Sequence, residues 1–184
     1  AYEVIKNFSV SATFKYLFSD MGRIGNSRGA SSVAFDLGVL YKCEINDWEG
    51  AGWSVGLHVS NLGPKINYLT SKDALPATVK VGGAADLPFL QMHKLTLTAD
   101  LGYRLSPADV QALSVSAGAE YAWRELVMLR GGYHCGDKKK GDASYATAGA
   151  GVEYAGVRLD FAWLFAGHEY LARNTFWVSL GYSF

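Results

Sequence analysis

The chain has 184 residues, which is room for one domain of ordinary size or for one small membrane barrel. Lys and Arg together number 17 and Asp and Glu also number 17, so the formal net charge is zero and there is no basic excess for nucleic-acid binding. The two cysteines, Cys43 and Cys135, are too few for a disulfide scaffold and form no CxxC metal or redox motif.

Apolar and polar residues are finely interleaved along the chain. Hydrophobic residues make up 49% of the sequence, yet the mean hydropathy is only +0.05. The longest stretch without Asp, Glu, Lys or Arg covers residues 50–64 and contains His58 and Asn61, whereas a spanning helix needs about 20 apolar residues. The sequence therefore predicts no membrane-spanning helix, and its 21 glycines and 14% aromatic residues favour strands and tight turns.

Period-two alternation predicts about ten strands in succession. The fifth is the clearest, with Leu95, Leu97 and Leu101 on one parity and Thr96 and Asp100 on the other. In chain order the predicted strands cover residues 8–18, 33–45, 53–60, 78–87, 94–104, 113–121, 127–134, 145–154, 157–165 and 176–184.

The charges of these strands lie on the polar parity and none lies on the apolar parity. They are Lys15, Asp36, Lys42, Glu44, Lys80, Asp86, Lys94, Asp100, Arg104, Glu120, Arg130, Glu153, Arg158 and Asp160. A soluble β-sandwich could show the same alternation. Three features favour a membrane barrel instead. The apolar face has aromatic residues at the strand ends, the strands have about ten residues, and the charges of the interior face balance. The sequence predicts a single all-β domain over residues 1–184, an antiparallel transmembrane β-barrel.

Connection lengths predict the orientation of this barrel. The connections at 19–31, 63–77, 104–111 and 135–143 are longer than those at 46–51, 88–93, 122–125 and 155–156. Bacterial outer-membrane barrels place long loops outside and short turns in the periplasm, so both chain ends are expected to be periplasmic. Cys43 and Cys135 then lie near opposite membrane surfaces, too far apart for a disulfide.

Several segments go beyond a generic barrel pattern and resemble the PorV/PorQ family of outer-membrane proteins. They read SSVAFDLGVLYK (31–42), GWSVGLHVSNLGPKINY (52–68), LPATVKVGGA (75–84), LRGGYHCGDKKKGDASYATAGAGVEYAGVRLDFAW (129–163) and NTFWVSLGYSF (174–184). The pair DLG and NLGPKI is the most unusual part. The resemblance implies a fatty-acid-transporter-like barrel that serves type IX protein secretion.

Barrels of that family have about fourteen strands, and the small-residue motifs of the family's N-terminal portion have no match in this sequence. The resemblance therefore implies that the chain is the C-terminal part of such a barrel, and the alternative is a small barrel closed by the ten strands alone. Residues 1–6 (AYEVIK) read as a linker, and the strand that begins near Phe8 is expected not to pair with the last strand.

Titratable residues give no sign of catalysis or metal binding. His134 and His168 fall near the outer rim with Asp137, Asp142 and Glu169 close in sequence, but their spacing matches no catalytic motif, and solvated loop residues are expected. His58 is expected in the interior hydrogen-bond network. No convergent set of ligands suggests a metal, and no cofactor site, catalytic residue or enzyme activity is predicted.

Two outer connections carry candidate binding residues. Lys138, Lys139 and Lys140 suit a solvated loop, with contact to anionic lipopolysaccharide or to a protein partner as the alternative. Segment 63–77 has apolar groups that should either fold back over the barrel mouth or meet a partner. Its candidate partner-binding residues are Pro64, Ile66, Tyr68, Leu69 and Leu75.

The functional hypothesis is a non-enzymatic outer-membrane barrel of the type IX secretion system. Its expected partners are outer-membrane lipid and lipopolysaccharide, other secretion-system proteins, and secreted cargo or surface-attachment partners bound through outer loops and rim. The alternative is a fatty-acid-transporter-like channel for small hydrophobic solutes.

Overall fold

The structure is a computed structural model that describes residues 2–19, 30–67, 72–167 and 174–183. In chain order the elements are β1 (Tyr2–Ile5), β2 (Phe8–Ser19), β3 (Ala30–Glu44), β4 (Gly52–Leu62), β5 (Ile66–Asn67), β6 (Lys72–Asp73), β7 (Thr78–Phe89), β8 (His93–Arg104), η1 (Ala108–Val110), β9 (Leu113–Trp123), β10 (Val127–Cys135), η2 (Lys138–Lys140), β11 (Tyr145–Tyr154), β12 (Val157–Ala166) and β13 (Phe176–Tyr182). Within these ranges no helix has the length and hydrophobicity needed to cross a bilayer.

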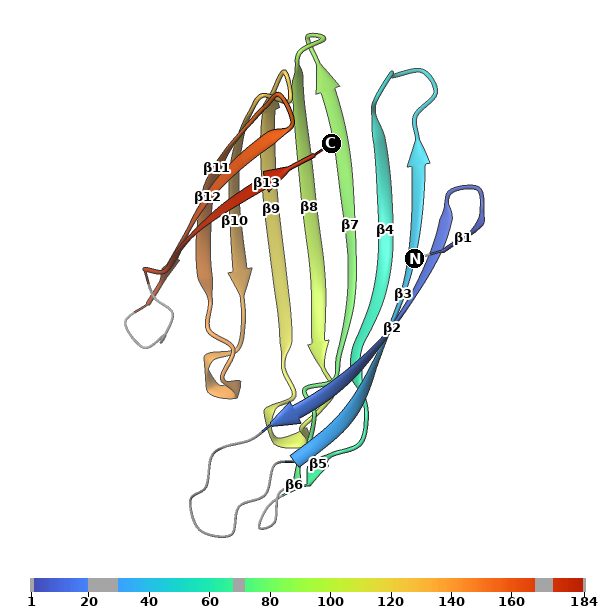
Figure 1. Cartoon of the computed structure of the whole chain (residues 1–184), viewed down its shortest axis with the longest axis vertical. Helices are drawn as coiled ribbons and strands as arrows, with labels where there is room; N and C mark the ends of the chain where they lie inside the picture. The colour runs from blue at the N-terminus through green and yellow to red at the C-terminus, as the bar shows by residue number, and fades with distance from the viewer. Residues whose placement is uncertain (1, 20–29, 68–71, 168–173, 184) are drawn as a thin grey trace.

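Eleven strands form one antiparallel sheet in the order β1-β2-β3-β4-β7-β8-β9-β10-β11-β12-β13, and β5 and β6 form a separate small hairpin (Figure 1). The ten predicted strands are confirmed as β2, β3, β4 and β7 to β13. Each long strand pairs with its neighbour in sequence, as expected where connections are short. Between β11 and β12, Ala155 and Gly156 both have positive φ, the backbone of a two-residue type I′ turn.

The prediction of a linker at residues 1–6 is wrong, because Tyr2–Ile5 forms β1. This strand pairs with β2, with Tyr2 opposite Val10 and Glu3 opposite Ser9. Asn7 adopts a φ of 73° at the turn, a left-handed conformation that asparagine tolerates better than most residues. A four-residue strand is too short for its alternation to be recognised in the sequence.

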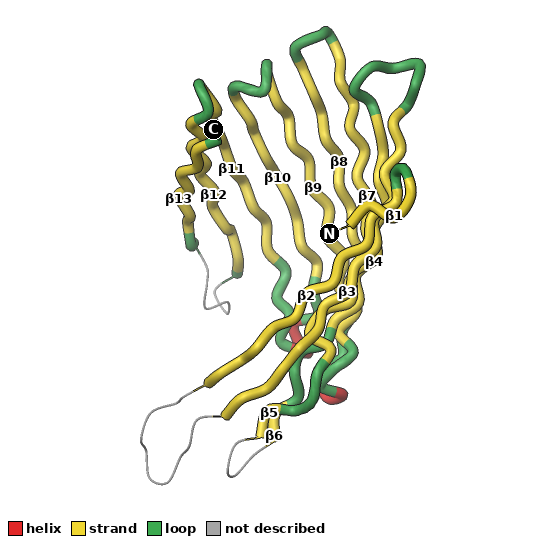
Figure 2. The backbone as a smooth tube through the Cα atoms, turned by 45° about the vertical axis from the view of Figure 1, so that its right-hand side comes forward, coloured by secondary structure: helices red, strands yellow, loops and turns green. Residues whose placement is uncertain are grey.

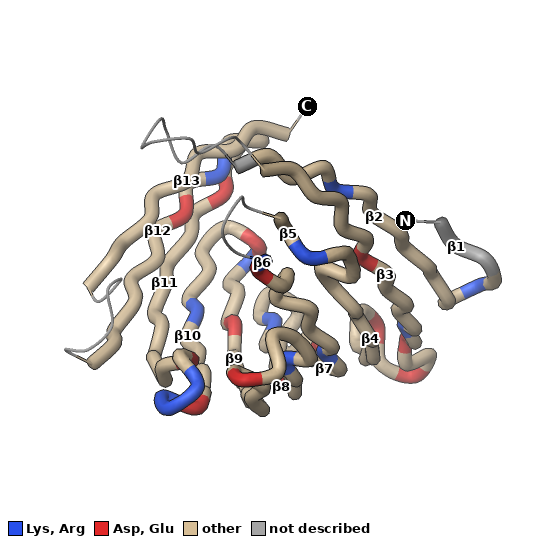
Figure 3. Tube along the Cα trace, turned by 90° about the horizontal axis from the view of Figure 1, so that it is seen from below, with Lys and Arg blue, Asp and Glu red and all other residues tan. Residues whose placement is uncertain are grey.

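The sheet is a single curved layer (Figure 2), with β5 and β6 on its concave side (Figure 3). The buried residues of β3, among them Ser32, Ala34 and Asp36, belong to the polar parity and face β5, so the polar parity lines the concave face. Leu97 and Leu101 of the apolar parity lie on the convex face, 43% and 49% exposed. This pattern confirms the barrel-type wall and excludes a sandwich, which would bury its apolar faces between two sheets.

Long and short connections lie at opposite rims of the sheet. The long-loop rim holds segments 63–77, 105–112 and 136–144, and the short-turn rim holds 45–51, 90–92, 124–126 and 155–156. In Figure 1, β3 runs toward the short-turn rim and β10 toward the long-loop rim. Cys43 near the end of β3 and Cys135 at the end of β10 are free thiols at opposite rims.

The sheet has two outer edges, β1 and β13. Among the described residues these two strands pair only with β2 and β12 respectively, and no ladder joins β2 to β13. Unpaired backbone groups are costly in hydrocarbon, so the edges are expected to be covered. Coverage by further strands, and the assignment of residues 1–184 to one domain, stay predictions.

Candidate functional site

The described parts of segment 63–77, residues 63–67 and 72–77, fold back against the first half of β3 on the concave side of the sheet (Figure 3). Leu75 is buried, and Ser32 Oγ donates a hydrogen bond to the carbonyl oxygen of Pro64 at 3.1 Å. A Cβ atom on Gly63 would lie 2.1 Å from the carbonyl oxygen of Val33, so only glycine allows this close approach. The segment is thus packed onto the wall at the long-loop rim.

A polar cluster of Lys15, Asp36 and Asn61, here called the Asp36 anchor, fixes the start of this segment. Asp36 Oδ1 accepts a hydrogen bond from the Asn61 backbone N–H at 2.8 Å, and Asp36 Oδ2 lies 2.5 Å from Lys15 Nζ. Lys15 Nζ also donates to Asn61 Oδ1 at 3.2 Å, and Asn61 Nδ2 donates to the Pro76 carbonyl at 3.2 Å. Both ends of segment 63–77 are therefore tied to one buried carboxylate through Asn61.

The anchor sits at a β-bulge in β4. Phe35 pairs with Leu62 and Leu37 pairs with Val59, so two residues of β4 lie opposite Asp36. Asn61 takes a φ of 57° there, and its N–H turns toward the Asp36 carboxylate. The DLG and NLGPKI motifs, which lie about 25 residues apart, thus meet in space.

The five candidate residues of the segment have different environments. Pro64 is exposed and Ile66 is half-buried in β5, whereas Leu75 is buried against the wall. Tyr68 and Leu69 lie outside the described residues. Folding back, one of the two expected arrangements, therefore applies to Leu75, and Pro64 and Ile66 stay accessible for contact. The anchor residues and Gly63 were not identified from the sequence, although the unusual DLG and NLGPKI pair was the signal for them.

A second polar cluster spans four strands on the concave face of the other half of the sheet. Arg130 on β10 lies 2.5 Å from Glu120 on β9 and 2.5 Å from Asp160 on β12. Arg130 reaches Asp160 across Gly151 of β11, where a Cβ would lie 2.5 Å from Asp160 Oδ1. Arg158 completes the network through Asp160 at 2.7 Å. Ion pairs inside the wall thus account for part of the balanced charges of the polar parity.

Removal of Arg130 is expected to destabilise this half of the wall. Arg130→Met leaves Glu120 and Asp160 without their shared cation, and the expected loss is about 1–2 kcal/mol, because the side chains are only partly buried. Urea unfolding in detergent micelles measures the effect. Adding Glu120→Gln to Arg130→Met removes the carboxylate that loses its cation, whereas Asp160 keeps its ion pair with Arg158. The double variant should recover part of the loss, and a double variant no more stable than the single one would contradict the network.

Ser116, His134 and Asp142 form a hydrogen-bonded chain near the long-loop rim. His134 Nδ1 lies 3.0 Å from Ser116 Oγ, His134 Nε2 lies 3.1 Å from Asp142 Oδ1, and the ring stacks on Tyr145. The expectation of solvated loop residues is wrong for His134 and Asp142. His134 is part of β10, and the His134 and Asp142 side chains are hydrogen-bonded to each other and largely covered. Asp137 caps η2, and His168 and Glu169 lie outside the described residues.

Ser116, His134 and Asp142 have the residue types of a hydrolase triad, but acyl transfer also requires an oxyanion hole, and none is formed around Ser116. Ser116 lies in the middle of β9, paired with Asp100 on one side and His134 on the other. Strand pairing uses the backbone N–H groups around it, so they do not form an oxyanion hole. The hydrogen bonds among Ser116, His134 and Asp142 therefore hold segment 136–144 against β9 and β10.

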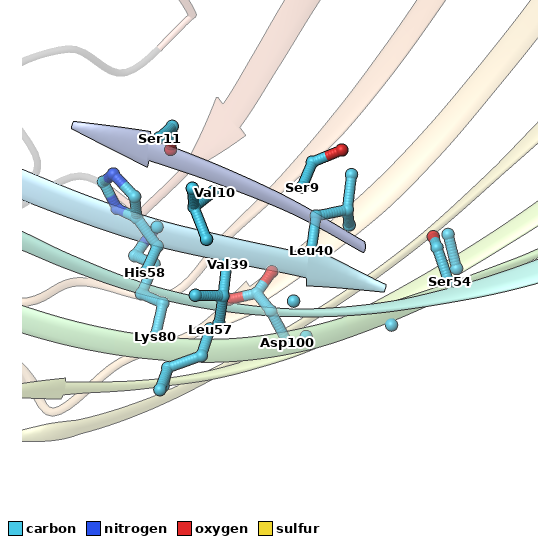
Figure 4. Close-up of a pocket in the computed structure, with 15 residues that line it drawn as sticks. Ser9, Val10, Ser11, Val39, Leu40, Ser54, Leu57, His58, Lys80 and Asp100 are labelled. Atoms are coloured by element: carbon cyan, nitrogen blue, oxygen red, sulfur yellow. The ribbon is translucent and has the colours of Figure 1, made fainter. Parts of the chain in front are cut away.

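A cavity of about 500 Å³ lies against the wall and is lined by residues of β2, β3, β4, β7 and β8. Its polar lining includes Ser11, His58, Lys80 and Asp100, and Figure 4 shows these side chains around it. His58 is on the concave face as expected, but its ring packs over Gly38 and makes no hydrogen bond within the described part of the chain, contrary to the prediction. In the same ranges no group of three or more His, Cys, Asp or Glu residues is arranged for a metal.

Comparison with known proteins gives one family. A family model described as "Type IX secretion system protein PorV" matches residues 1–111. The match covers β1 to β8, and with them the Asp36 anchor and segment 63–77. No curated protein matches the chain.

Proposed function

Because the chain belongs to the PorV family of type IX secretion system proteins, we propose that segment 63–77 binds a protein partner of that system at the long-loop rim. Family membership makes the chain an outer-membrane protein of the secretion system. The proposed partner is a secreted cargo domain or a surface-attachment protein, and the proposed activity is binding without catalysis.

The fixed position of the described parts of segment 63–77 carries this proposal. The Asp36 anchor, the Ser32–Pro64 hydrogen bond and buried Leu75 hold residues 63–67 and 72–77 against the wall, with Pro64 exposed and Ile66 half-buried among exposed polar residues. A surface that is already ordered loses less conformational entropy on binding than a free loop does. An ordered apolar contact at the rim is what recognition of a protein partner requires.

The orientation completes the proposal. Outer-membrane barrels have short periplasmic turns and long outer loops, so we infer that the long-loop rim faces the cell exterior. Segment 63–77 then lies on the side where secreted proteins arrive. The C-terminal strand β13 runs toward the short-turn rim (Figure 1), so in the inferred orientation this end of the chain would be periplasmic.

The alternative channel for hydrophobic solutes has less support. The concave face carries paired charges such as Lys15–Asp36 and Arg130–Asp160. The cavity over β2 to β8 has apolar lining from Val10, Leu40 and Leu57, but a path for fatty acids would need apolar lining that continues along the wall. A long-chain lipid that co-purifies inside the wall would favour the channel over the binding function.

Ile66→Asp is expected to weaken partner binding at least tenfold, because it places a charge in the proposed apolar contact. The measurement is a quantitative pull-down of tagged protein from detergent-solubilised outer membranes, with the co-purified secretion proteins identified by mass spectrometry. Leu90→Asp, the same kind of change at an exposed turn of the short-turn rim, is the control and should retain all partners. Unchanged recovery of every partner by Ile66→Asp would overturn the proposal.

A further inference from the structure

Four cations, Arg104, Lys138, Lys139 and Lys140, lie together at the long-loop rim and are here called the rim patch. Arg104 Nη1 donates to the carbonyl oxygen of Lys140 at 3.3 Å, and Lys140 Nζ donates to the carbonyl oxygen of Asp109 at 3.1 Å. These contacts join the connection between β8 and β9 to the one between β10 and β11. Both acceptors are backbone carbonyls and neither is a carboxylate.

The segment that carries the three lysines is well ordered. Asp137 Oδ1 accepts a hydrogen bond from the Lys139 N–H at 2.9 Å, and Gly141 closes the turn in the left-handed conformation with its N–H on the Lys138 carbonyl. The Asp142 side chain binds His134 on β10. The lysine side chains thus extend from a fixed turn, and little backbone entropy opposes ligand binding there.

The charges of the rim patch differ from those inside the wall. Lys15, Lys94, Arg130 and Arg158 each form an ion pair with a carboxylate on the concave face. Across the described ranges, no ion pair with a carboxylate involves any of the four rim-patch cations. The Lys138 and Lys139 side chains are exposed, and the four cations outnumber the two exposed carboxylates of the same connections, Asp109 and Asp137.

The position of the patch relates it to the membrane surface. Figure 3 shows Lys138–Lys140 at the rim beside β10, away from the concave side where β5 and β6 lie. The apolar convex face below it ends in Tyr103, Leu113 and Tyr133, each more than 40% exposed. Aromatic side chains at strand ends mark the level of lipid headgroups in membrane barrels. The rim patch therefore lies at the height of the phosphate groups of the adjacent leaflet.

We propose that the rim patch binds the phosphate groups of lipopolysaccharide, the anionic lipid of the outer leaflet. The proposal rests on the proposed orientation, in which the long-loop rim faces outward. Lysines at a membrane surface attract anionic lipid, and exposed ammonium groups on an ordered turn suit the closely spaced phosphates of a lipid A headgroup. The patch is separate from segment 63–77, so the protein would hold lipid and protein partners at different places on one rim.

The test uses the full chain in nanodiscs of zwitterionic phosphatidylcholine, titrated with lipid A that carries two phosphates and with the same lipid A after removal of both. Wild-type protein should bind the phosphorylated form more tightly. Lys138→Gln with Lys139→Gln should weaken that binding about tenfold, leave binding of the dephosphorylated form unchanged, and lose the difference in high salt. The control is Lys6→Gln with Lys42→Gln, which removes two exposed charges outside both the rim patch and segment 63–77 and should bind as wild type does.

Three results would overturn the proposal. They are equal binding of the two lipid A forms by wild-type protein, wild-type affinity in the Lys138 and Lys139 variant, and displacement of lipid A by inorganic phosphate at equal phosphate concentration, which would indicate a site for a free anion. The same variant should retain its secretion partners in the pull-down. If wild-type protein does not bind lipid A but still loses its partners when Ile66 is replaced by Asp, the lipid site is refuted and the proposed function is not.

Discussion

Leu97→Arg is expected to block assembly of the sheet in a membrane or to cost about 2–4 kcal/mol of stability, whereas Thr96→Arg should be tolerated. Leu97 lies on the convex face, 43% exposed, near the middle of β8. An arginine there would place its charge in hydrocarbon. Thr96 lies on the concave face, where it pairs with Asp86 and Glu120, and an arginine at that position would meet two carboxylates.

The two variants form a matched pair, because they place the same side chain on adjacent residues of one strand. The measurement is the folded fraction after insertion into liposomes, followed by urea titration of the folded protein. Equal damage from both substitutions would contradict the assignment of the convex face to lipid. Damage from Thr96→Arg alone would reverse the two faces.

Gly63→Val is expected to detach segment 63–77 from β3. The nearest atom to a new Cβ would be the Val33 carbonyl oxygen at 2.1 Å, a backbone atom that cannot move without breaking the sheet. Overpacking against side chains costs about 1–3 kcal/mol, and a contact with fixed backbone is expected to cost about 3 kcal/mol or more. The local docked state should therefore be lost, while the ladder between β3 and β4 persists.

Limited trypsin digestion of the protein in liposomes measures this detachment, since Lys65 and Lys72 lie in the segment. Cleavage at these two residues should rise at least tenfold in Gly63→Val. Gly131→Val is the control, because a Cβ at Gly131 meets nothing within 4 Å. A Gly63→Val protein that resists trypsin as wild type does would show that the segment is held in another way.

Partner binding by Gly63→Val, compared with that by Ile66→Asp, connects the fold to the proposed function. If segment 63–77 must be held in place to recognise a secretion partner, Gly63→Val should lose the partner together with Ile66→Asp. Retention of the partner by a detached segment would mean that Ile66 acts without the anchor. The two outcomes differ in whether partner binding needs the position that the Asp36–Asn61 hydrogen bond gives to the segment.

Local side-chain alternation is sufficient to identify the strands and their faces. In a strand the side-chain period is two, so each run of alternating residues predicted both a strand and the side that faces lipid, as Leu97 and Thr96 illustrate. Short connections then required neighbouring strands to pair in sequence order. The sequence thus determined the ten long strands, their antiparallel order and the separation of charge from the apolar face. It did not reveal β1, whose pattern is too short.

Only the tertiary structure decided which polar side chains meet. Asp36 contacts Asn61 because a single extra residue in β4 changes the register, and no local pattern encodes that bulge. Arg130 reaches Asp160 because glycine occupies the strand between them, and His134 joins Ser116 because their strands pair in that register. These contacts depend on positions many residues apart along the chain. The alternation fixes the face of each side chain, but register and close backbone approach select its partner.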